Sequence, residues 1–229
     1  MRQQFIATVN TKKFEEICDE LISPESLTGP SFAMITGPAG RGKTEAARHY
    51  SVHYGSIYIP PMITRTPAML LREISFELAG TRPSRTDGCL DVIGEEMSKK
   101  RQLIMIDEAD LLEMRCLEML RNVNESFACP ILLIGEESLK GKIGARRRLF
   151  SRIRRRLEFG PINQHDISYY LRAVLDVKTT PDVLSIIHRY ANGDWRPVLT
   201  MIIGIERAMK TSNVNEITPA MVKDVLKNS

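Results

Sequence analysis

The chain has 229 residues, of which 43% are hydrophobic and 26% are charged, with 14 Gly and 12 Pro. This composition indicates a folded protein of one or two domains and excludes collagen, repeat arrays and disordered chains. The longest apolar runs are far shorter than the roughly 20 residues of a membrane span, and residues 1–16 lack a signal-peptide core. The four cysteines are Cys18, Cys89, Cys116 and Cys129. Because no two of them are closely spaced in the sequence, they indicate neither a zinc site nor a disulfide framework. We therefore expect a cytoplasmic protein without a membrane partner.

Apolar periodicity predicts alternating helices and strands in the first two thirds of the chain. Phe14, Ile17, Cys18 and Leu21 lie on one face of a helix over residues 11–22. Predicted strands follow at 32–36, 57–59, 103–106 and 130–134. Helices are predicted at 45–53, 66–80, 87–99 and 116–124, with a polar loop at 81–86. This alternation is typical of an α/β protein with a parallel sheet.

After a short apolar run at 157–159 the pattern changes to helices only. They are predicted at 166–176, 181–192, 196–210 and 219–228, and two of them start with Thr-Pro. We expect two domains, an α/β core over 1–160 and a small all-α domain over 161–229.

The sequence Gly37-Pro38-Ala39-Gly40-Arg41-Gly42-Lys43-Thr44 matches G-x-x-x-x-G-K-[ST] between a predicted strand and helix. In such a loop, backbone N–H groups bind nucleotide phosphates, Lys43 reaches the β- and γ-phosphates and Thr44 ligates Mg²⁺. The strand 103–106 ends in Asp107-Glu108, at the sheet edge where α/β proteins bind ligands. Asp107 is predicted to hold Mg²⁺ through water, and Glu108 to polarise the attacking water. These residues predict ATP hydrolysis.

The net charge of +4 is unevenly distributed. Residues 140–156 contain nine Lys and Arg and no acid, whereas the rest of the chain has 23 basic and 28 acidic residues. Such a concentration indicates contact with a polyanion, although a solvated surface helix is the alternative.

Together these motifs resemble the AAA+ ATPase family, over about residues 32–228. The resemblance implies a three-layer αβα core, with a five-stranded parallel sheet in the order 5-1-4-3-2, a helical lid, and oligomers whose neighbouring subunits complete each ATP site. Within that pattern, Arg196 in Gly193-Asp194-Trp195-Arg196 resembles the second sensor, which contacts the γ-phosphate. Arg152, in Arg148-Leu149-Phe150-Ser151-Arg152-Ile153, resembles the arginine finger that acts on a neighbouring site, with Arg148 as the second choice.

The first sensor departs from the family pattern, which places Asn, Thr or Ser at the end of the fourth strand. Glu136 occupies this place. A carboxylate near the γ-phosphate and Glu108 is electrostatically unfavourable unless it is protonated or turned away, so we expect slow turnover.

Among AAA+ proteins the chain resembles transposition ATPases of the MuB and TnsC type. The resemblance implies ATP-dependent, sequence-nonspecific binding to duplex DNA, self-assembly as a helical filament, delivery of target DNA to a transposase and disassembly on hydrolysis, in a bacterial or phage-infected cytoplasm. The N-terminal helix-turn-helix domain of MuB is expected to be absent, so DNA contacts would come from the core. Candidate contacts are the basic residues Arg65, Arg82, Arg85, Lys99, Lys100, Arg101, Lys140, Lys142, Arg146, Arg147 and Arg148.

Three alternatives remain open at this point. A helicase loader of the DnaC or IstB type would use a similar core but bind a helicase and prefer single strands. A nucleotide-gated scaffold would need no DNA, which fits Glu136 but not the basic segment. A small-molecule P-loop kinase is disfavoured by the Asp107-Glu108 pair and the separate helical domain.

Overall fold

A computed structural model describes residues 5–25, 29–61 and 66–227. These residues form two compact units. One contains residues 9–38 and 43–159 and holds the β-sheet; the other contains residues 5–8, 39–42 and those from 160 onward, and is helical apart from its loops. In the described part of the chain no helix is both long and apolar enough to cross a membrane.

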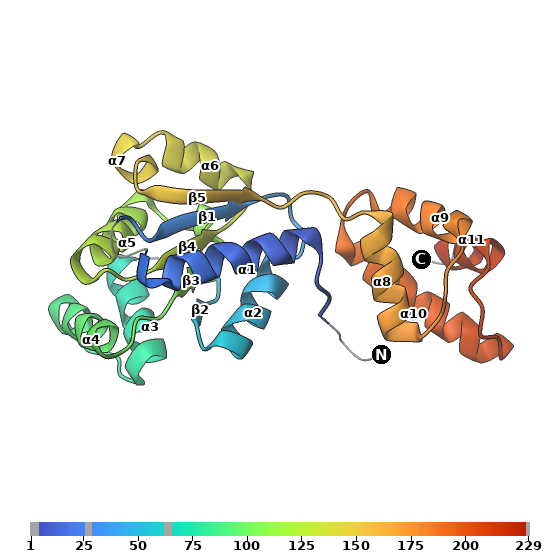
Figure 1. The fold of residues 1–229 in the computed structure, drawn as a ribbon, viewed down its shortest axis with the longest axis horizontal. Coiled ribbons are helices and arrows are strands. Elements are labelled where there is room, and N and C mark those ends of the chain that lie inside the picture. The colour runs from blue at the N-terminus through green and yellow to red at the C-terminus, as the bar shows by residue number, and fades with distance from the viewer. Residues whose placement is uncertain (1–4, 26–28, 62–65, 228–229) are drawn as a thin grey trace. The chain divides into compact units, whose positions relative to one another are not determined.

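The sheet has five parallel strands in the order β2-β3-β4-β1-β5 (Figure 1). The strands are β1 (Phe32–Thr36), β2 (Ile57–Ile59), β3 (Ile104–Ile106), β4 (Ile131–Ile134) and β5 (Ile153–Glu158). This is the predicted order 5-1-4-3-2 read from the other edge, so the predicted fold class is confirmed. The nearly unbroken apolar runs of β1 and β4 are buried on both faces, as expected for central parallel strands.

Strand alternation divides the core between the two faces of the sheet. Ala33, Ile35 and Met105 pack on one face with α1 (Val9–Ile22) and α2 (Lys43–Tyr54). Phe32, Met34 and the other alternate positions pack on the opposite face. The helices on that face are α3 (Pro67–Ala79), α4 (Thr86–Lys99), α5 (Met114–Phe127), α6 (Glu137–Gly144) and α7 (Arg147–Phe150). The layers therefore form an αβα sandwich.

The helical unit contains α8 (Gln164–Leu175), α9 (Pro181–Ala191), α10 (Trp195–Ser212) and α11 (Pro219–Lys227). Its core contains Ile167, Leu171, Ile187 and Ile202, all fully buried. The predicted Thr-Pro start of α9 is confirmed, because the Thr180 side chain accepts a hydrogen bond from the backbone N–H of Val183. All four predicted helices are present.

The main differences from the predicted elements lie between β4 and the helical unit. Short helices α6 and α7 were not predicted, and β5 begins at Ile153 rather than near residue 157. Three consecutive arginines, 154–156, occupy this edge strand and hide its apolar pattern. Charged side chains on an edge strand are common because they discourage pairing with another chain.

Candidate nucleotide-binding site

The Gly-rich loop follows β1 directly and leads into α2. Gly37 has a φ of 147°, and a Cβ there would lie 2.8 Å from the carbonyl oxygen of Phe159. The position therefore needs glycine for both its backbone conformation and its close packing.

Lys43, the first residue of α2, is 9% exposed. Its Nζ donates hydrogen bonds to the carbonyl oxygens of Gly37, at 2.7 Å, and Pro38, at 2.8 Å. The ammonium group thus lies inside the curve of the loop, next to the N-terminus of α2. A positive side chain and a helix N-terminus at one place form an anion site suited to phosphate.

The middle of the loop, residues 39–42, belongs to the helical unit. The backbone N–H of Trp195 donates to the carbonyl oxygen of Gly40 at 2.9 Å, and a Cβ on Gly40 would clash with the Asp194 carboxylate. Arg196 is exposed in the first turn of α10, and its backbone N–H donates to Asp194 Oδ1 at 2.7 Å. The contact of Arg196 with the γ-phosphate stays a prediction.

Thr44 and Asp107 meet across the space between α2 and the end of β3. The Thr44 hydroxyl donates to Asp107 Oδ2 at 2.8 Å, and Asp107 is only 5% exposed. Hydroxyl and carboxylate oxygens are ligands that Mg²⁺ prefers, and Mg²⁺ takes its remaining ligands from water and nucleotide phosphates. The residues therefore fit a nucleotide-bound Mg²⁺ ion.

Glu108 is exposed and has a left-handed backbone, with φ 49° and ψ 39°. Its backbone N–H donates to Asp107 Oδ1 at 2.9 Å. A non-glycine residue in this conformation costs about 1–3 kcal/mol and is common at functional sites. Glu108 is exposed, whereas its neighbour Asp107 is buried.

Two residues near this site were missed by the sequence interpretation. The Tyr58 hydroxyl donates to Asp107 Oδ2 at 2.7 Å, and burial, followed by this hydrogen bond, raises the pKa of Tyr58 well above its usual value. Asp110 Oδ1 accepts from the backbone N–H of Glu136 at 3.0 Å and would clash with a side chain at Gly135. No sequence motif marks Asp110, whereas Tyr58 stands out as a polar side chain between two buried isoleucines of β2.

Glu136, predicted at the first sensor position, is the exposed N-cap residue of α6. The Asp110 hydrogen bond holds its backbone next to the loop that follows Asp107 and Glu108. Its carboxylate is in solvent, and its role as a sensor stays a prediction.

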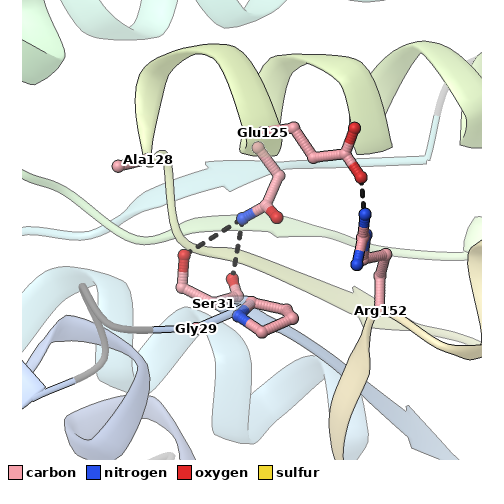
Figure 2. A pocket seen from close by; sticks show the side chains of 7 residues that line it. Gly29, Ser31, Glu125, Ala128 and Arg152 are labelled. Carbon is pink, nitrogen blue, oxygen red and sulfur yellow. Dashed lines mark hydrogen bonds and ion pairs between the residues drawn. The ribbon is translucent and has the colours of Figure 1, made fainter.

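Arg152, the predicted arginine finger, follows α7 and borders a pocket of about 260 Å³ (Figure 2). Its Nε lies 2.6 Å from Glu125 Oε1 on α5. The rest of the pocket is lined by Gly29, Pro30, Ser31, Asn124 and Ala128. Asn124 Nδ2 donates to Ser31 Oγ at 3.0 Å, which joins α5 to the residue before β1.

The candidate DNA contacts fall into two groups. Several basic side chains are already paired: Arg82 with Glu73, Arg85 with Asp87, Lys99 with Glu96, Lys140 with Glu158, Lys142 with the carbonyl oxygens of Asp110 and Leu112, and Arg101 with those of Ile22, Ser23 and Ala128. Arg146, Arg147 and Arg148 are exposed, and no carboxylate of the described residues lies within ion-pair distance of them. Lys100 is also exposed, and Arg65 lies outside the described residues.

Known proteins with similar sequences point to the same kind of molecule. Residues 27–143 match the AAA domain family. The chain is 34% identical over 154 residues to ATP-dependent target DNA activator B of Escherichia phage Mu, covering 62% of this chain and 48% of the relative. It is 28% identical over 134 residues to Mu-like prophage FluMu DNA transposition protein B of Haemophilus influenzae, covering 53% and 46%. The chain thus spans about half the length of these curated relatives.

Among solved structures, the ORC2 protein of Aeropyrum pernix superposes with a TM-score of 0.72 at 15% identity, covering 96% of this chain and 68% of that protein. At this identity the likeness concerns the fold alone. The family match covers half of the chain, and the Lys43, Thr44 and Asp107 geometry agrees with it. This chain belongs to the AAA domain family of P-loop ATPases and is related in sequence to the Mu-type transposition B proteins.

Proposed function

We propose that the chain is an ATP-dependent target-DNA activator, which binds duplex DNA in its ATP state and presents it to a transposase. The observation that carries the proposal is the match to a relative named as an ATP-dependent target DNA activator, in a chain that keeps the Lys43, Thr44 and Asp107 site. The proposed organisation is an ATPase core over 1–160 and a helical lid over 161–229.

For hydrolysis, the proposal assigns one role to each residue of the site. Lys43 exchanges its carbonyl partners for the β- and γ-phosphates, and Thr44 and Asp107 hold Mg²⁺. The ion, when bound, neutralises charge on the phosphate oxygens. Glu108, which directly follows the Mg²⁺ ligand Asp107 in the chain, accepts a proton from the attacking water. Arg196 within the chain and Arg152 from a neighbouring subunit would stabilise negative charge as it develops.

For DNA binding, the strongest candidates are Arg146, Arg147 and Arg148. These three consecutive, exposed residues are at the start of α7, and none has a carboxylate partner among the described residues. Phosphate contacts by Arg are independent of base sequence and lose strength steeply with salt. As the resemblance to MuB-type ATPases implies, we propose that several copies assemble along the duplex as a filament and that hydrolysis releases them.

The ATPase part of the proposal is tested with Lys43→Ala and Glu108→Gln. Phosphate release is measured with and without duplex DNA, and nucleotide affinity with a fluorescent ATP analogue. Lys43→Ala should lose nucleotide binding, whereas Glu108→Gln should bind the analogue within about 2-fold of the unmodified chain and release no phosphate. Unchanged phosphate release by Glu108→Gln would overturn the assignment of the base.

A further inference from the structure

Strand alternation brings Tyr58 and Asp107 to the same face of the sheet, although 49 residues separate them. In β2, Ile57 and Ile59 face the core under α3, α4 and α5, so Tyr58 faces α1 and α2. In β3, Met105 also faces α1 and α2, and Asp107 comes two residues later. The two side chains thus converge beside the N-terminus of α2, where Thr44 lies.

The Asp107 carboxylate is oriented by three hydrogen-bond donors from three elements. Thr44 Oγ1 on α2 and the Tyr58 hydroxyl on β2 both donate to Oδ2, at 2.8 and 2.7 Å. The backbone N–H of Glu108 donates to Oδ1 at 2.9 Å. Thr44 has two proposed roles, because the hydroxyl that donates to Asp107 would also be a ligand of Mg²⁺. The Tyr58 hydroxyl has the single role of donating to Asp107.

The position of Tyr58 is itself fixed by the helix that carries Thr44. The Arg48 guanidinium lies 5.7 Å from the centroid of the Tyr58 ring, and Arg48 follows Thr44 by one helical turn. The backbone N–H of Asp107 also donates to the carbonyl oxygen of Ile59 at 3.1 Å, which ties the end of β3 to β2. Tyr58 is itself half-buried.

We propose that Tyr58 is a positioning residue for the Mg²⁺ ion of the nucleotide site. It acts through Asp107, by holding the carboxylate in the orientation in which Asp107 and Thr44 contact the ion and its water together. This inference rests on the proposed nucleotide and Mg²⁺ site. Partners that orient metal ligands typically contribute 10–100-fold to metal affinity or activity, so loss of one hydroxyl should be measurable.

The test is Tyr58→Phe, which removes the hydroxyl and keeps the ring. Binding of a fluorescent ADP analogue is titrated with Mg²⁺, starting in EDTA. We expect the Mg²⁺ concentration that gives half of the full increase in analogue binding to rise about 10-fold in this variant. The affinity for the analogue in EDTA should stay within about 2-fold of that of the unmodified chain. Tyr54→Phe is the matched control, because Tyr54 is exposed on α2 and stacks on Tyr50 rather than contacting the site.

The outcomes separate this inference from the proposed function. If Mg²⁺ does not strengthen nucleotide binding to the unmodified chain, the proposed nucleotide site itself is wrong. If it does so and Tyr58→Phe responds to the same Mg²⁺ concentrations, the positioning role is overturned.

Discussion

Arg152 Nε and Glu125 Oε1 are 2.6 Å apart, so the proposed arginine finger is ion-paired within its own chain. Both side chains are partly exposed, at 44% and 35%, and such a pair contributes only roughly 0.2–1 kcal/mol. The contact is made by Nε. Because the pair contributes so little, breaking it would cost little if Arg152 turned toward a neighbouring subunit.

Arg152→Ala is expected to reduce DNA-stimulated ATP hydrolysis at least 10-fold while nucleotide affinity stays within about 2-fold, because a finger acts on the transition state of another subunit. Phosphate release and fluorescent-nucleotide binding measure the two quantities. Arg121→Ala is the matched control, since Arg121 Nη1 lies 3.3 Å from the same Glu125 carboxylate. Equal losses in both variants would instead indicate a shared structural role at Glu125. A loss confined to Arg148→Ala would move the finger to Arg148.

Replacing Arg146, Arg147 and Arg148 together by Ala should weaken duplex binding and flatten its salt dependence. Each phosphate contact contributes about 0.9 to the slope of log K against log salt, so the slope should fall by up to about 3 for each bound copy. Fluorescence anisotropy at several salt concentrations measures this slope.

The matched control for that triple variant is Arg154→Ala with Arg155→Ala. Both guanidinium groups already pair with Glu20, at 3.3 and 2.6 Å, and are expected to contribute less to DNA binding. A larger loss in the control pair than in the triple variant would place the DNA on β5 instead of α7.

Glu136→Asn should raise ATP turnover several-fold. The substitution removes a negative charge from the loop next to Glu108 and restores a side chain of the type expected at the first sensor. Glu137→Gln, one residue later on the exposed start of α6, is the control for a general charge effect. If both variants change turnover equally, or if neither does, the prediction that Glu136 slows hydrolysis is wrong.

The cysteines should be unreactive in the folded chain. All four are buried, and burial raises the pKa of Cys129 to about 12. The thiolate that reacts with DTNB is therefore scarce at pH 8. Because the pKa in the unfolded chain is lower, Cys129 stabilises the fold below about pH 9, and this contribution is lost as the pH rises toward 12.

DTNB titration at pH 8 measures this protection, with a sample in guanidinium chloride as the reference. Four thiols should react in denaturant and fewer than one in the folded state within minutes. Rapid reaction of Cys129 without denaturant would contradict the packing of the β-sheet core.

The sequence was sufficient to predict β1, β3 and β4, because their apolar runs are short and buried on both faces. It was sufficient for β2 because the short run 57–59 is stopped by Pro60-Pro61. The motif also predicts the strand, loop and helix in which Lys43 and Thr44 lie, whereas Asp107 follows a separate buried strand; the phosphate and Mg²⁺ roles of these residues stay predictions. Prediction from the sequence failed at β5, where Arg154, Arg155 and Arg156 obscure an edge strand.

Side-chain contacts between residues far apart in the chain could not be predicted from the sequence. The Tyr58 hydrogen bond to Asp107 depends on the pairing of β2 with β3, which no local pattern specifies. Arg101 follows Lys99 and Lys100 in the sequence, and such a basic run predicts an exposed charged surface. Its guanidinium donates to carbonyl oxygens of Ile22, Ser23 and Ala128, so it joins the ends of α1 and α5.

The most direct test of the proposed function is binding of a labelled duplex of arbitrary sequence, measured with ATP, with ADP and without nucleotide at two salt concentrations. Lys43→Ala is measured in parallel. We predict tight, salt-sensitive binding that increases with duplex length, in the presence of ATP only, and none by Lys43→Ala. Absence of duplex binding in every nucleotide state, or equal binding by Lys43→Ala, would contradict the proposal that ATP controls contact with target DNA.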